Sequence, residues 1–116
     1  MTAGHGQDMQ DFRKGSTALL VLHVLADEPM YGFQLVEALR ARTGGVLDFA
    51  EGMLYPMLHK LERAGLLAAE WQPGGDGPPR KYYHLTPAGR DELERRRGEW
   101  TRFADAVDTA LGLSRR

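Results

Sequence analysis

The seven residues from Pro73 to Pro79 are all Pro, Gly or Asp, and they strongly constrain the fold of this 116-residue chain. Such a segment cannot continue a helix, and its prolines lack the N–H group that a strand ladder needs. On either side lie Leu66–Gln72 and Arg80–Leu85, two short runs with apolar and aromatic side chains. The pattern predicts a β-hairpin whose loop is Pro73–Pro79.

Two helices are predicted in the first half of the chain. Ser16 or Thr17 can cap the first helix, in which leucines and valines recur every three or four residues as far as Leu25. The second helix begins near Tyr31 and ends at Thr43-Gly44-Gly45, because glycine suits the backbone of a helix end. The segment 46–49 that follows is long enough for one rung of a sheet.

A third helix is predicted from Glu51 to Ala64, and its two sides differ in chemistry. At about 100° per residue, one sector is apolar and predicts a core contact. It consists of Leu54, Met57, Leu58 and Leu61. The opposite side, which is free to contact another molecule, consists of Met53, Pro56, His59, Lys60 and Arg63. We expect Pro56 in the first turn, where a proline removes no hydrogen bond.

One long helix is predicted after the hairpin, from the cap Thr86 and the first helical residue Pro87 to about Leu111. Its apolar residues recur every three, four or seven positions, which is the spacing of a dimer seam. They are Leu93, Trp100, Phe103, Val107 and Leu111. A helix of about 25 residues spans roughly 37 Å, more than so small a body covers. We therefore predict that this stripe packs on a second copy of the chain.

The composition, 42% hydrophobic and 27% charged, is that of a globular protein. The lack of a long apolar run and of a signal peptide predicts a cytoplasmic protein with no membrane partner. The chain has no Cys, which excludes disulfides and thiolate metal sites. Because 15 basic and 16 acidic residues give a net charge of −1, the placement of charge is more informative than its sum.

The predicted fold class is mainly α with a small β-hairpin, in the order of a winged helix-turn-helix domain followed by a dimerisation helix. We expect a flexible N-terminal arm over residues 1–15, the winged domain over 16–86, and the dimerisation helix with its tail over 87–116.

In a winged helix-turn-helix domain the third helix enters the DNA major groove and the hairpin contacts flanking DNA. The exposed side of the third helix, together with Tyr55 and with Arg80 and Lys81 at the base of the hairpin, carries groups suited to phosphates and bases. Each has a plainer interpretation, as a solvated charge, a half-buried ring or a guard on an edge strand. Together they favour DNA, because both elements lie on the same side of this architecture.

Several strings in the chain resemble the motifs of PadR-family transcriptional regulators, over about Ser16 to Leu111. They are Tyr31-Gly32-Phe33-Gln34-Leu35, Gly52-Met53-Leu54-Tyr55-Pro56, Gly65-Leu66-Leu67, and Gly77-Pro78-Pro79-Arg80-Lys81-Tyr82-Tyr83 with Leu85-Thr86, Gly89 and Trp100. The short tail after Trp100 is similar to the subgroup with a single C-terminal helix. Met53 stands where the family usually has a small residue such as Thr, so the resemblance does not fix the base preference at that position, and Met53 is suited to apolar contact with a thymine methyl group.

The resemblance implies a homodimeric repressor of a palindromic operator, with a dimer interface formed by the C-terminal and first helices. It implies DNA contacts from Gly52 to Lys60, from Arg80 and Lys81, and from Tyr31 at the start of the second helix. Similar proteins stack flat aromatic or phenolic effectors near a tryptophan at the dimer centre. That similarity implies an effector site at Trp100 and Phe103, beside the plainer interpretation of Trp100 as part of the dimer core.

Two other functions are considered. The near-neutral charge is compatible with a winged-helix protein-interaction module that does not bind DNA. An enzyme is disfavoured, because the four His are dispersed and neither a nucleophile motif nor a phosphate loop is found. His59 and Glu62 lie one helical turn apart but lack a third metal ligand, so neither a metal nor a cofactor is predicted.

Overall fold

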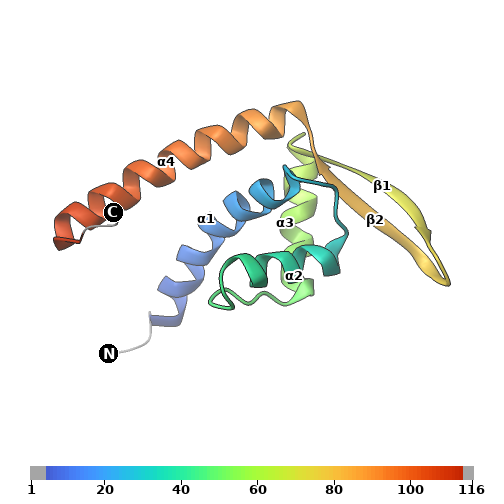
Figure 1. Ribbon diagram of the computed structural model, residues 1–116, viewed down its shortest axis with the longest axis horizontal. Helices are drawn as coiled ribbons and strands as arrows, with labels where there is room; N and C mark the ends of the chain where they lie inside the picture. The colour runs from blue at the N-terminus through green and yellow to red at the C-terminus, as the bar shows by residue number, and fades with distance from the viewer. Residues whose placement is uncertain (1–4, 114–116) are drawn as a thin grey trace.

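The computed structural model describes residues 5–113, with side chains from residue 15 onward. Its elements are α1 (His5–Leu25), α2 (Gly32–Arg42), α3 (Glu51–Arg63), β1 (Leu67–Gly74), β2 (Gly77–Leu85) and α4 (Pro87–Leu111). Helices α1, α2 and α3 form the body, the hairpin projects from one end, and α4 runs back past α1 (Figure 1). The predicted fold class, a winged helix-turn-helix with a long C-terminal helix, is confirmed.

The core lies where the three body helices meet the base of the hairpin. Its largest fully buried side chains are Tyr83, Leu22, Leu35, Leu39, Leu54, Leu58 and Leu67. The apolar side predicted for α3 packs inward, since Leu54, Leu58 and Leu61 are buried and Met57 is partly buried against the same cluster. These leucines fix which side of α3 remains outside.

The predicted start of the first helix at Ser16 or Thr17 is wrong. Helix α1 begins at His5, so both residues lie inside it. The residues before Ser16 lack an apolar period, which is why the sequence suggested an arm. Extending a helix that is already packed costs little once it has nucleated, so a polar stretch can join it. Residues 1–4 of the predicted arm lie outside the described residues.

The predicted hairpin is present, but Pro73–Pro79 is not all loop. The strands pair in register from Leu67 opposite Leu85 to Gln72 opposite Arg80, and continue after an irregularity to Gly74 opposite Gly77. Only Gly75 and Asp76 remain for the turn, where Gly75 has a φ of 66°. In a two-stranded ribbon every strand is an edge strand, so prolines can point their missing N–H away from the partner.

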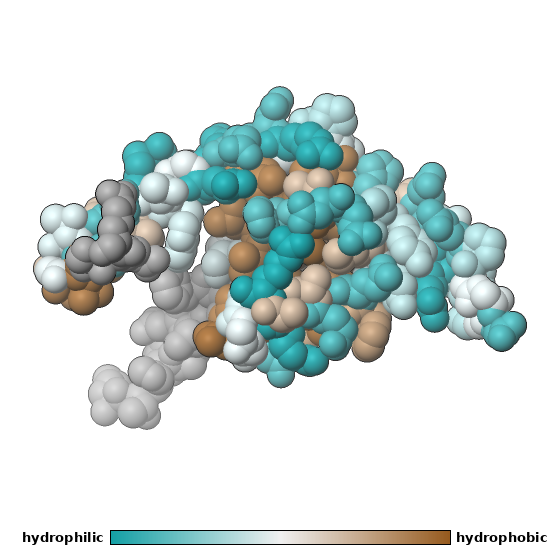
Figure 2. All heavy atoms as spheres, in the orientation of Figure 1, coloured by the Kyte–Doolittle hydropathy of each residue, from teal (hydrophilic) through white to brown (hydrophobic). Residues whose placement is uncertain are grey.

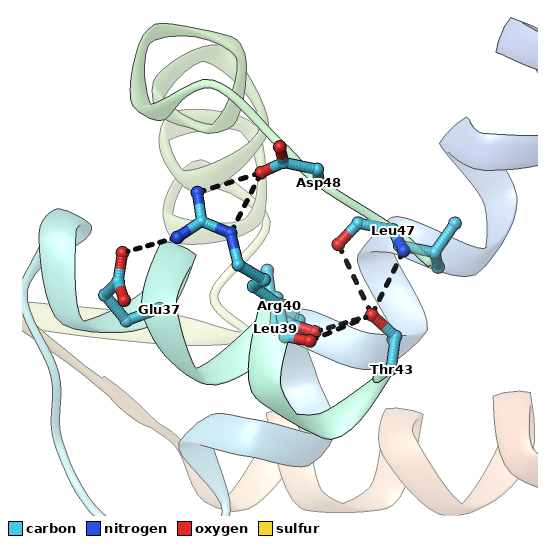
Figure 3. Close-up of polar contacts among 6 residues, drawn as sticks. All are labelled: Glu37, Leu39, Arg40, Thr43, Leu47 and Asp48. Carbon is cyan, nitrogen blue, oxygen red and sulfur yellow. Dashed lines mark hydrogen bonds and ion pairs between the residues drawn. The ribbon is translucent and has the colours of Figure 1, made fainter. Parts of the chain in front are cut away.

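Residues 46–49 form no strand. Instead Tyr83 of β2 pairs with Met30, just before α2, in an isolated antiparallel bridge. The hydroxyl of Thr43 donates to the carbonyl of Leu39 at 2.9 Å and accepts from the N–H of Leu47 at 3.1 Å, which holds the backbone in a turn (Figure 3). Two guanidinium nitrogens of Arg40 also donate to Asp48, at 3.2 and 3.0 Å. The loop leading into α3 is thereby fastened to the end of α2.

Thr86 joins the hairpin to α4 without a linker. Its N–H donates to the carbonyl of Leu66 at 3.1 Å and its hydroxyl donates to the carbonyl of Gly65 at 2.7 Å. The same hydroxyl accepts from the N–H of Gly89 at 3.0 Å, as expected for the predicted helix cap. Gly89 packs so closely on the segment between α3 and β1 that a methyl group there would lie 2.2 Å from the carbonyl oxygen of Leu66.

The outer half of α4 leaves the body and is exposed. Leu93 near its start is buried in the core, whereas Trp100, Phe103, Val107 and Leu111 are exposed. Apolar side chains are visible at the free end of α4 and along the flank of the body beneath it (Figure 2). Within residues 5–113, no helix combines the length and the apolar character that a membrane span requires.

Candidate nucleic-acid interface

The side of α3 that faces away from the core is exposed along its whole length. Its surface residues include Gly52, Met53, Tyr55, Pro56, His59, Lys60 and Arg63, all predicted DNA contacts. Lys60 and Arg63 lie in its last turn. Because three leucines hold the other side in the core, these residues form one continuous surface.

The expectation that Pro56 lies in the first turn is wrong. Helix α3 begins at Glu51, so Pro56 is the sixth helical residue and lies in the interior. A proline there cannot donate to the carbonyl of Gly52, four residues earlier, and an interior proline costs about 3 kcal/mol in an ordinary helix. The carbonyl of Gly52 is left without that backbone donor at the exposed start of α3.

An open groove of about 470 Å³ separates the start of α3 from the hairpin, which we call the wing. Tyr31, Glu51, Tyr55 and His59 line the side formed by the helices. Trp71, Pro79, Arg80, Lys81 and Tyr83 line the side formed by the wing. The structure thus brings most of the predicted contact residues to one groove, flanked by the exposed side of α3.

Tyr31 connects the start of α2 to the wing. Its ring packs edge-on against that of Tyr82, with centroids 5.3 Å apart, and the guanidinium of Arg80 lies 4.6 Å from the centroid of the Tyr31 ring. A cation over an aromatic face is attracted by the ring quadrupole. Tyr31 therefore orients the exposed Arg80 side chain at the mouth of the groove.

The hydroxyl of Tyr55 is already occupied as a donor. It donates to the carboxylate of Glu51, one turn earlier on α3. This hydrogen bond, together with burial of the ring, raises the pKa of Tyr55 to about 12. The sequence suggested Tyr55 as a hydrogen-bonding group toward DNA, but only its oxygen lone pairs remain for that purpose.

Lys81 is held within the protein. Its ammonium donates to the carboxylate of Glu62 on α3 at 3.2 Å and lies 5.2 Å from the centroid of the Tyr83 ring. The pair is only partly exposed, and it also fastens the wing to α3. Of the two predicted cations of the wing, Arg80 is the more exposed.

Three residues at this interface, Trp71, Glu51 and Glu62, were not predicted from the sequence. Trp71 continues the alternation of Leu67 and Ala69 on β1, a signal that could have placed it on the same side of the strand. Glu51 and Glu62 were considered only as a helix start and a weak metal ligand. No three His, Asp or Glu side chains in the described part of the chain gather closely enough to hold a metal ion.

The predicted dimer seam divides into two parts. Leu93 is only 4% exposed and belongs to the core of its own chain, so it has little surface to offer a partner. Leu93 belongs to the core cluster and α4 also contacts α1, and the sequence spacing could not separate a contact with the body from one with a second copy. The other four residues are exposed. The ring centroids of Trp100 and Phe103 lie 6.0 Å apart, and the two ring planes form an angle of 46°.

The fold and the exposed side of α3 define a winged helix-turn-helix transcriptional regulator. Residues 21–95 match the transcriptional regulator PadR-like family, so the chain belongs to that family. The transcriptional regulator Rv3488 of Mycobacterium tuberculosis is 41% identical over 85 residues, which cover 73% of this chain and 76% of the relative. The family is one of transcriptional regulators and not of enzymes.

Solved structures share the architecture. The crystal structure of a PadR family transcriptional regulator from Eggerthella lenta matches with a TM-score of 0.78 and 38% identity, covering 91% of this chain and 90% of that one. Bacillus subtilis PadR, crystallised in complex with operator DNA, matches with a TM-score of 0.63 and 22% identity, over 69% of this chain and 46% of that one. At that identity the similarity to the Bacillus protein concerns the fold alone.

Proposed function

We propose that this regulator binds a palindromic operator as a homodimer and represses transcription. The proposal rests mainly on one observation. The exposed side of α3 is continuous, and it lies beside a groove that Arg80 lines from the wing. In a winged helix-turn-helix protein such a helix lies in the major groove while the wing contacts the adjacent backbone. Bacillus subtilis PadR, which shares the fold, was crystallised in complex with operator DNA, and this supports operator DNA as the ligand.

Local charge supports DNA as the ligand although the chain has a net charge of −1. Lys60, Arg63, Arg80 and Lys81 provide four cations on this side of each protomer. If Arg63, Arg80 and Lys81 of each protomer each neutralise one phosphate, log K should fall with log salt with a slope of about −5 for the dimer. The test is a binding titration across salt concentrations on a duplex selected by the protein from a random pool. A slope near zero would contradict the proposal.

The roles of the helix and the wing can be separated by two substitutions. Lys60→Ala should weaken binding to the selected duplex by roughly 1–3 kcal/mol and change random DNA less, because it removes a contact to a base. Arg80→Ala should weaken both duplexes alike and reduce the salt slope of the dimer by about 2, because it removes one phosphate contact from each protomer. Equal losses on both duplexes for Lys60→Ala would exclude base recognition by that residue.

The exposed end of α4 supports the homodimer. Two copies joined through Trp100, Phe103, Val107 and Leu111 would place two α3 helices on one duplex. A two-fold dimer requires half-sites about one helical turn apart, and a footprint of that spacing tests this arrangement.

The same seam is the proposed effector site. A flat aromatic compound that stacks on Trp100 and Phe103 and favours one dimer geometry shifts the DNA-binding equilibrium by its differential affinity. The test compares operator affinity with and without a phenolic acid, in the wild type and in Trp100→Ala. Release of DNA from the wild type alone supports the effector site, whereas identical affinities under all four conditions contradict it.

The second candidate function, a protein-interaction module, is favoured by the net charge of −1. It predicts no retention on heparin or on calf-thymus DNA at low salt. Retention that high salt abolishes argues against it.

A further inference from the structure

Trp71 is the largest apolar side chain on the wing and is 67% exposed. It lies directly opposite Lys81 in the hairpin register, so the two side chains point to the same face of the ribbon. Toward the body, the same face carries the buried residues Leu67, Tyr83 and Leu85. Trp71 thus continues the inward-facing row beyond the point where the body ends.

The indole of Trp71 faces α3 across the groove. Lys81, its partner in the register, bonds Glu62 of α3, which shows that this face of the wing turns toward that helix. Trp71 and His59 of α3 line opposite walls of the same groove. An isolated exposed apolar side chain is common on protein surfaces. This one stands beside the side of α3 on which the proposed function places the duplex.

The outer part of the wing, residues 72–79, carries no cation that could attract DNA. Between Gln72 and Pro79 the chain has no Lys or Arg, and its one charged residue is the acidic Asp76. Contact between this segment and the phosphate backbone cannot rest on charge. An indole can provide such contact, because its ring packs on a deoxyribose while its N–H donates to a phosphate oxygen.

We propose that Trp71 is a DNA-contact residue, which packs on the sugar–phosphate backbone at the edge of the major groove that α3 occupies. This inference rests on the proposed function and adds an uncharged contact to it. Neutral contacts release no counterions, so the contribution of Trp71 should be the same at every salt concentration. That property distinguishes it from Arg80.

The test measures the affinity of the full chain for the selected duplex over a range of salt. Trp71→Ala should lower the affinity about tenfold, as expected when an apolar contact worth about 1.4 kcal/mol is removed, and should leave the salt slope unchanged. Trp71→Phe, which keeps a ring and loses the N–H donor, should lose less. Gln72→Ala is the matched control, because it changes an exposed neighbour on the opposite face of the strand and should bind as the wild type does.

A second measurement, the tryptophan emission, tests the contact without relying on a loss of affinity. DNA should change the tryptophan emission of the wild type, and Trp71→Phe should abolish that change although Trp100 remains. Thermal unfolding should give the same Tm for Trp71→Ala and the wild type, since the side chain is mostly exposed.

The outcomes separate this inference from the proposed function. If the wild type binds no duplex, the proposed function fails. If the wild type and Arg80→Ala behave as expected but Trp71→Ala binds as the wild type does, only the assignment of Trp71 is overturned. It is also overturned if the emission is unchanged by DNA, or if Trp71→Ala alters the oligomeric state in light scattering, which would place the indole at a protein interface.

Discussion

The hydroxyl of Tyr55 donates a hydrogen bond to the carboxylate of Glu51, and both groups lie against the first residue of α2, Gly32. A methyl group at Gly32 would lie 2.5 Å from the Tyr55 oxygen and 3.2 Å from a carboxylate oxygen of Glu51. Because Gly32 has no side chain, α3 can approach the start of α2 closely. This contact fixes the end of α3 that carries Met53 and Pro56.

Glu51→Gln should lower the pKa of Tyr55 from about 12 toward its ordinary value of 10.0. In the wild type the pKa of Tyr55 is higher in the folded chain than in the unfolded chain. Its contribution to stability is therefore complete below pH 10 and is lost as the pH rises toward 12. Tyrosinate absorbance during a pH titration measures the shift. Glu94→Gln, at an exposed position of α4, is the control and should leave the titration unchanged.

Gly89→Ala should destabilise the protein by about 1–3 kcal/mol, because the new methyl group must displace the backbone of Leu66 or the side chain of Leu85. Gly98→Ala on the same helix is the matched control. The nearest atom to its methyl group would be 3.7 Å away, so the higher helix propensity of alanine should stabilise by up to about 1 kcal/mol. Denaturant unfolding at one protein concentration compares the two. Equal stabilities would contradict the close contact at Gly89.

Glu92→Gln should make the stability less sensitive to acid. Hydrogen bonds from Arg95 and Arg96 lower the pKa of Glu92 from 4.5 to about 2. The carboxylate therefore stabilises the fold above pH 4.5 and loses this contribution as the pH falls toward 2. Ion pairs within a helix contribute about 0.3–0.5 kcal/mol each, so the effect should be small but measurable.

The measurement for Glu92 is the free energy of unfolding at neutral pH and near pH 3, in the wild type and in the variant. Glu94→Gln serves as the control, because its partner Arg97 is 3.8 Å away and the Glu94 side chain is 71% exposed. A loss of stability in acid as large in Glu92→Gln as in the wild type would show that other groups cause it.

Val107→Lys should separate the proposed dimer into single chains at micromolar concentration, because it buries an unpaired charge in the seam. Thr109→Lys adds the same charge about 200° further around the helix and should leave the dimer intact. Light scattering gives the oligomeric state, and circular dichroism confirms that both variants fold. A dimer that survives Val107→Lys would place the interface elsewhere.

The order of helices and strands could be predicted from the sequence, because local signals determine it. The leucines of α3 identify its buried side, and Thr86 followed by Pro87 marks the start of α4. The beginning of α1 could not be predicted, since a polar stretch can extend a packed helix. The length of the wing was underestimated because proline is excluded only from positions that must donate to a partner strand.

The candidate interface was predicted in outline but not in its contacts. Spacing along α3 placed Met53, Pro56 and Lys60 on the exposed side, where the structure has them. Pairs between distant parts of the chain, such as Lys81 with Glu62, depend on the packed fold and have no signature in the sequence. For the same reason the spacing assigned Leu93 to the dimer seam, although it lies in the core of its own chain.

Because Thr86 directly follows β2 and caps α4, a rotation of α4 would be transmitted to the wing with no linker to absorb it. The nine residues of β2 form an arm about 30 Å long at about 3.3 Å per residue. A tilt of about 10° at its base displaces the tip by about 5 Å, more than the length of a hydrogen bond. The bonds from Thr86 to Gly65 and Leu66 couple the same rotation to the last turn of α3. In the proposed dimer, a small change in how the two copies pack at the far end of α4 would be amplified into the loss or gain of contacts at the proposed operator.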